Sequence, residues 1–64
     1  MEYTNSKIRE LIAEHIHNRR DREILSDRLI DGLTFEQISE KYDMSVRQIK
    51  NIVYKSQTQL FKHL

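Results

Sequence analysis

The sequence predicts an all-α domain of four helices, and three observations support that prediction. Apolar residues recur at helical spacing of three and four through most of the chain. No stretch alternates strictly between apolar and polar residues, as a half-buried strand does. Proline is absent and the single glycine is Gly32, which leaves few places for a helix to break.

The length of the chain predicts one domain, residues 1–64, with a small core. A domain of this size buries only about 60% of the surface that its unfolded chain exposes. Cysteine is absent, which excludes disulfides and thiolate metal sites, so a helical core or a partner must supply the stability. The chain has no run of the ~20 apolar residues that a membrane span needs and no signal peptide at its N-terminus. We therefore expect a cytoplasmic protein without membrane contact.

Two helices are expected in the N-terminal half, at residues 5–17 and 19–31. The apolar stripe of the first comprises Ile8, Leu11, Ile12 and Ile16. Asn18 marks the boundary, because asparagine suits either a helix end or the next N-cap. The apolar side of the second comprises Ile24, Leu25, Leu29 and Ile30. Gly32 is expected to end this helix, since glycine adopts the left-handed conformation without a Cβ penalty.

The third helix is expected at residues 35–42, with Thr34 as its N-cap. Gln37 stands three residues after the cap, where a capping box requires Glu or Gln. Leu33 and Ile38 occupy the two positions of a hydrophobic staple, which fixes the angle at which the chain enters the helix. The apolar side of this helix comprises Phe35, Ile38 and Tyr42.

Asp43 and Met44 are expected to form a tight turn into a fourth helix at residues 46–62, capped by Ser45. Such a turn usually contains glycine because one residue has a positive φ, and aspartate is one of the few other residues that tolerate it. The buried side of this long helix comprises Ile49, Ile52, Val53, Ser56, Leu60 and Leu64. A short helix, a tight turn and a longer helix form the pattern of a helix-turn-helix, whose second helix enters the major groove of DNA.

Basic residues are concentrated at the C-terminal end, although the net charge of the chain is only +1. Residues 44–64 contain four bases and no acid, a net charge of +4, whereas residues 1–43 contain seven bases and ten acids, a net charge of −3. Because fields act over a Debye length of about 8 Å, the basic end can face phosphates while the rest faces away. A solvated basic helix face is the alternative interpretation.

The outward side of the fourth helix carries the candidate DNA contacts. With the apolar side facing the core, helical periodicity leaves Val46, Arg47, Lys50, Asn51 and Tyr54 outward. Arginine can make bidentate contacts with guanine, and asparagine can do so with adenine. Groups that suit phosphates, which position a protein without reading sequence, are Lys50, Lys55 and the hydroxyls of Ser45 and Tyr54. A helical hairpin with a solvated outer face is the alternative; the two caps, the small Ser39 at the helix crossing and the acid-free second helix favour DNA binding.

Several segments follow one another in the order and spacing of a known family. They are the run from Asp21 to Leu25, Arg28, the run from Asp31 to Glu40, the pair Met44 and Ser45, and the pair Ile49 and Lys50. This pattern resembles region 4 of sigma-70 family factors over residues 20–64. The related LuxR-type effector domains share much of it.

The resemblance implies a domain that binds the −35 promoter element in the major groove and docks on the flap of RNA polymerase. It implies base contacts at Val46, Arg47 and Asn51, and a backbone contact at Lys50. Arg28 matches a family arginine near the phosphates. Val46 stands where principal sigma factors often carry an arginine that contacts a guanine. The resemblance therefore implies a departure from the standard −35 sequence, in which the valine would contact a thymine methyl. Because the family's promoter-melting region is missing, a complete sigma factor is not expected.

The rival interpretation is a small helical protein-interaction module that binds RNA polymerase, a sigma factor or itself, with little direct DNA contact. Its basis is the amount of apolar surface on the fourth helix, because apolar surface in excess of what a small core covers marks a partner site or homodimer face. The residues concerned are Ile52, Val53, Leu60, Phe61 and Leu64.

We expect no enzyme, cofactor or metal site. The carboxylates of Asp27, Asp31 and Glu36 cluster in sequence beside no candidate nucleophile and no glycine-rich phosphate loop. His15 and His17 are two residues apart and therefore face different directions on a helix.

Overall fold

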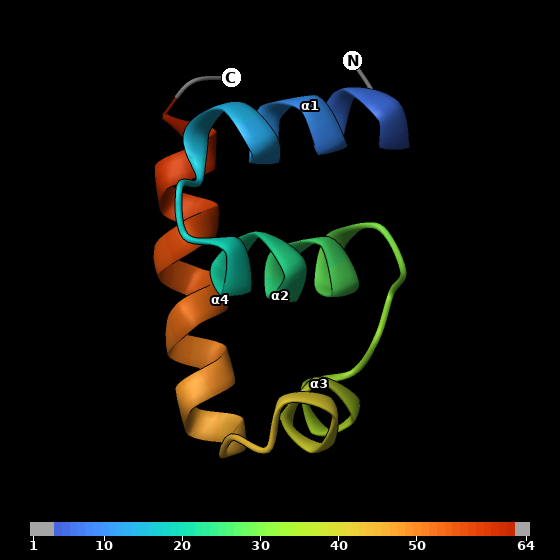
Figure 1. Cartoon of the computed structure of the whole chain (residues 1–64), viewed down its shortest axis with the longest axis vertical. Coiled ribbons are helices and arrows are strands. Elements are labelled where there is room, and N and C mark those ends of the chain that lie inside the picture. Colours follow the sequence, from blue (N-terminus) through green and yellow to red (C-terminus); the bar gives the residue numbers. More distant parts are fainter. Residues whose placement is uncertain (1–3, 63–64) are drawn as a thin grey trace.

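The computed structural model describes residues 4–62 and folds them into four helices joined by short connections (Figure 1). Within this part of the chain there is no strand, so the prediction of an all-α fold with four helices is confirmed. The helices are α1 (Asn5–His15), α2 (Arg19–Leu29), α3 (Phe35–Tyr42) and α4 (Val46–Phe61). Leu64 of the expected apolar stripe lies outside the described residues.

The longest helix, α4, organises the fold. It contacts each of the other three helices, whereas α1 and α3 do not contact one another. Figure 1 shows α1, α2 and α3 one below the other beside α4, with α1 at its C-terminal end and α3 at its N-terminal end. The first turns of α4 are therefore held by α2 and α3 and lie far from α1.

The core is made of aliphatic side chains contributed by all four helices and the α1–α2 connection. The buried set is Leu11, Ile12, Ile16, Ile24, Leu25, Ile38, Ile49, Val53 and Leu60. Full burial of such a side chain contributes about 1.5–3 kcal/mol relative to leaving it in water. Since α4 supplies three of these residues, its inward side is required for the fold, and only its outward side is free to meet a ligand.

Each helix begins at the residue that the sequence indicated, because a polar side chain satisfies one of the unpaired N–H groups of the first turn. Thr4, Asn18, Thr34 and Ser45 each accept a hydrogen bond from the backbone three residues on. The caps of α3 and α4 are complete capping boxes: Gln37 Oε1 accepts from Thr34 N at 2.8 Å, and Gln48 Oε1 accepts from Ser45 N at 3.0 Å. Both helices of the helix-turn-helix therefore start at fixed residues.

The turn between α3 and α4 has the predicted left-handed residue. Asp43 has φ 54° and ψ 47°, and Met44 N donates to Ser39 O at 3.0 Å. Met44 then packs against the core, which anchors the turn. The expected Asp43 conformation is confirmed, and it sets the angle between the two helices.

The first two helices each end two residues earlier than predicted. Helix α1 stops at His15 because Ile16 is extended, with φ −108° and ψ 111°, which lets Asn18 cap α2. Helix α2 stops at Leu29, since Asp31 N donates at 3.2 Å to Ser26 O, five residues before it, in place of the helical bond to the residue four before it. Gly32 does have a positive φ of 70°, as expected, but it stands three residues past the last helical residue.

Candidate nucleic-acid interface

The structure places seven of the eight expected contact residues on or next to the first three turns of α4. Ser45, Arg47, Lys50, Asn51, Tyr54 and Lys55 are exposed, and Val46 is half-buried. On the opposite side of the helix, Ile49 and Val53 are buried in the core. The predicted division of α4 into an inward and an outward side is therefore observed, with a surface free of acids from Ser45 to Phe61.

The N-terminus of α4 adds backbone donors to this surface. The Ser45 hydroxyl accepts from Gln48 N at 3.1 Å, which leaves its own hydrogen available to an acceptor. Val46 and Arg47 are the first two helical residues, so their N–H groups have no carbonyl partner four residues before them. A helix N-terminus with such donors favours an anion such as phosphate.

The eighth residue, Arg28, lies on α2 and contacts the ring of Phe35, which Lys50 of α4 also contacts. Its guanidinium carbon lies 4.3 Å from the centre of the Phe35 ring, and its Nη1 donates to Leu33 O at 3.0 Å. Lys50 Nζ lies 5.6 Å from the same ring centre. The Tyr54 ring approaches Phe35 edge-on, with centroids 6.2 Å apart and planes at 72°. We call these four residues, Arg28, Phe35, Lys50 and Tyr54, the Phe35 cluster.

The Phe35 cluster joins three helices through weak contacts. A cation within about 6 Å of an aromatic ring gains about 0.5–1 kcal/mol at an exposed site, and an edge-to-face aromatic pair gains about 0.5–1.5 kcal/mol. Sequence reasoning assigned Phe35 only to the apolar side of the third helix. The spacing of Arg28, Phe35 and Lys50 along the chain contains no signal for this contact, because it depends on how α2, α3 and α4 cross.

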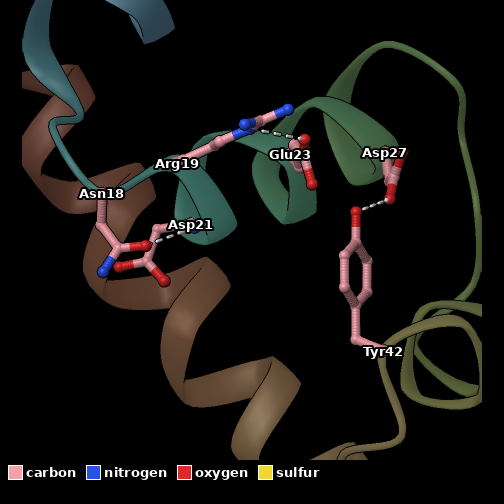
Figure 2. Close-up of polar contacts among 6 residues, drawn as sticks. All are labelled: Asn18, Arg19, Asp21, Glu23, Asp27 and Tyr42. Carbon is pink, nitrogen blue, oxygen red and sulfur yellow. Dashed lines mark hydrogen bonds and ion pairs between the residues drawn. The ribbon is translucent and has the colours of Figure 1, made fainter.

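A second polar cluster fastens α3 to α2 (Figure 2). The carboxylate of Asp27, only 5% exposed, accepts from Tyr42 Oη at 2.7 Å and from Lys41 Nζ at 3.0 and 3.1 Å. Burial, followed by the hydrogen bond to Asp27, raises the pKa of Tyr42 to about 12. The hydrogen bond to Asp27 also raises the pKa of Lys41. The first helix of the helix-turn-helix is thus tied to α2 by three hydrogen bonds.

Asp27 is a structural residue that sequence reasoning missed. The acid was considered only with Asp31 and Glu36 as a sequence cluster, whereas the structure buries Asp27 alone of the three. A signal was present: Asp27 follows Ile24 by three residues, which places the two on one side of α2. Tyr42 was expected in the core; its ring does pack against the core, and its hydroxyl reaches Asp27.

The described residues contain neither a candidate metal site nor a candidate membrane-spanning helix. Within residues 4–62, no group of three or more His, Asp or Glu side chains is placed to hold a metal ion. In the same residues, no helix combines the length and the hydrophobicity needed to cross a membrane.

Together, these features define a class of protein. A short capped helix, a turn with one left-handed residue and a longer capped helix with an exposed side of basic and amide groups make a helix-turn-helix of the kind that binds DNA. The family model for sigma-70, region 4, matches residues 18–62, which is 45 of the 64 residues. The chain therefore belongs to the sigma-70 region 4 family, a family of DNA-binding domains that act in transcription. Neither the curated proteins nor the solved structures contain a significant match to the chain.

Proposed function

We propose that this chain is a transcriptional regulator that binds a specific sequence of duplex DNA with α4 in the major groove. The observation that carries the proposal is the outward side of α4, which is exposed and acid-free in a sigma-70 region 4 domain; α3 and α4 each begin with a complete capping box. The same helix contacts the rest of the fold along its inward side, so it can enter a groove without losing its support.

In this proposal, α4 reads bases with its first turns. Arg47 and Asn51 are one helical turn apart on the exposed side, and they would read guanine and adenine respectively. Val46 is half-buried and presents an apolar side chain suited to a thymine methyl. Phosphate contacts, which fix the register on the duplex, are assigned to Arg28, Ser45, Lys50, Tyr54 and Lys55.

A protein-interaction module remains the second candidate, favoured by one specific observation. Phe61, at the C-terminal end of α4, is 52% exposed. It lies 15 residues from Val46, or about 22 Å along the helix. A partner such as RNA polymerase, a sigma factor or a second copy of this chain would therefore meet a surface apart from the DNA-reading residues, and both functions are compatible.

Selection of bound sequences from a random duplex library, followed by titration of the selected duplex and a shuffled one, tests the proposal. We expect an enriched motif and an affinity for the selected duplex at least tenfold above that for the shuffled duplex. The spacing of half-sites in the motif would reveal a dimer. Absence of binding to any duplex up to about 100 µM protein, the weak limit of ordinary non-specific binding, would reject DNA binding. In that case, the mass of the free chain, measured by sedimentation, decides whether the chain associates with itself instead of binding DNA.

A further inference from the structure

We propose that Phe35 is a positioning residue for DNA binding: its ring holds the side chains of Arg28 and Lys50 so that both bind one backbone phosphate. This inference rests on the proposed function. It goes beyond it because Phe35 belongs to α3, faces partly inward and is assigned no DNA contact of its own.

The distances to the Phe35 ring limit how far apart the two cations can lie. The Arg28 guanidinium carbon and Lys50 Nζ are 4.3 and 5.6 Å from one ring centre, so they are at most about 10 Å apart. Arg28 comes from α2 and Lys50 from α4, and no hydrogen bond or ion pair joins these two side chains in the described residues. The ring of Phe35 is the group that both side chains contact, while Leu33 O also holds the guanidinium of Arg28.

Neither cation is neutralised by the protein. The ion pairs of residues 4–62 involve Lys7, His15, Arg19, Arg20 and Lys41, but neither Arg28 nor Lys50. Two like charges held near one another repel, and an anion between them removes that repulsion. The cluster is thus arranged in the way that an anion-binding site requires.

Unused hydrogen-bond donors suit an oxyanion, and in the proposed complex with DNA that anion is a backbone phosphate. Arg28 uses Nη1 to hold Leu33 O, which leaves other guanidinium N–H groups free, and Lys50 has three donors. The Tyr54 hydroxyl, on a side chain that is 56% exposed, supplies a further donor from the same cluster. A ring attracts cations through its face without accepting their N–H hydrogen bonds strongly, so the cations stay available to phosphate oxygens.

Pre-organisation explains why a ring would serve this purpose. Free arginine and lysine side chains have many rotamers, and ordering them on binding costs affinity. Contact with Phe35 removes part of that cost before the duplex arrives. A Phe35 that only fills space would have no such effect on affinity, which gives the experiment its contrast.

Fluorination of the Phe35 ring separates its proposed role in positioning the two cations from a role in filling space. The chain is short enough for chemical synthesis with mono-, di- and trifluorophenylalanine at position 35, which weakens the attraction of the ring for cations with little change of shape. We expect the Kd for the selected duplex to rise with each fluorine, by threefold to tenfold over the series. Circular dichroism monitors the fold, and the monofluoro chain, the smallest change, remains informative if the trifluoro chain unfolds.

A double-mutant cycle assigns the effect to the cations. In chains that also carry Lys50→Ala, the rise in Kd over the fluorine series should shrink to less than half, because one of the two cations is gone. An equal rise with and without Lys50 would show that the ring does not act on binding through Lys50 and would overturn the two-cation inference. A flat series in a chain that binds its duplex also overturns it, while leaving the proposed function intact. If the native chain binds no duplex, the proposed function fails and this inference fails with it.

Discussion

The hydrogen-bonded carboxylate of Asp27 leads to a sharp prediction about stability. Asp27→Asn keeps the size of the side chain but removes its charge and one of its two acceptor oxygens. Tyr42 Oη and Lys41 Nζ both bond to Asp27 Oδ2, at 2.7 and 3.0 Å, and Lys41 also bonds to Oδ1 at 3.1 Å. An amide has one acceptor, so it cannot keep all three bonds.

The expected loss follows from what each partner contributes. A hydrogen bond to a charged group contributes about 1.5–3 kcal/mol, which applies to the bond from Tyr42. The Lys41 side chain is 53% exposed, so water screens its ion pair and the bond from Tyr42 dominates the loss. Because asparagine retains one neutral bond, we expect Asp27→Asn to lower the free energy of unfolding by about 2 kcal/mol. For a domain of this size, that corresponds to a fall in Tm of roughly 10 °C.

Thermal and urea unfolding followed by circular dichroism measure the change. Asp31→Asn, which alters the charge equally at an exposed neighbour, is the matched control and should leave Tm within a few degrees. A Tm for Asp27→Asn equal to that of the control would refute the reasoning. It would mean that the buried carboxylate costs as much in desolvation as its three bonds return.

The same cluster predicts a loss of stability at high pH. The folded pKa of Tyr42 is raised from 10.0 to about 12, so the neutral hydroxyl is the stabilised form. Its contribution is fully present below pH 10 and is lost as the pH rises through about 12. We expect the Tyr42 component of the tyrosinate absorbance, identified by its loss in Tyr42→Phe, to titrate nearer to 10 in Asp27→Asn. An unmoved Tyr42 titration in that variant would contradict the role of the hydrogen bond.

Three further predictions concern the helix-turn-helix. Arg47→Ala should weaken binding to the selected duplex by about 1–3 kcal/mol and relax the preference at one base pair. Arg9→Ala, the same change at an exposed position of α1, should do neither. Equal losses of affinity for selected and shuffled DNA would exclude base reading by Arg47. Lys50→Ala should weaken binding to all duplexes and lower the slope of log K against log salt by about one, and a slope equal to that of native protein would mean that Lys50 meets no phosphate. Asp43→Gly should raise the free energy of unfolding by up to about 1 kcal/mol in urea titrations, because φ is 54° there, and a lower stability would show that the aspartate side chain itself holds the turn.

Local rules were sufficient to predict most of the fold from the sequence. Capping depends on residues three positions apart, so Thr34 with Gln37 located the start of α3 correctly. The left-handed conformation of Asp43 was also predicted from local sequence, because aspartate is one of the few residues that tolerate a positive φ in a tight turn between two helices. Helical periodicity then divided α4 into inward and outward sides, and with them the candidate site.

The features that the sequence did not predict are the end of α2 and the contacts between helices. The early end of α2 depends on Ser26 O accepting two N–H groups and on Leu33 N donating to Asp27 O at 3.0 Å, an arrangement that no residue type dictates. The partners of Asp27 and Phe35 lie on other helices, 14 or more residues away for Lys41 and Tyr42. Periodicity states which side of a helix is buried but not which side chain it meets, so both clusters became visible only in three dimensions.

The central place of α4 in the fold has a consequence for how new binding preferences could arise. Of the residues assigned to base reading, Arg47 and Asn51 are exposed and Val46 is half-buried outside the core, whereas their neighbours Ile49 and Val53 belong to the core. Substitutions at the reading positions therefore cost little folding free energy, and a library randomised there should consist mostly of folded proteins. A rigid frame with freely exchangeable surface positions is a good starting point for engineering recognition of other DNA sequences.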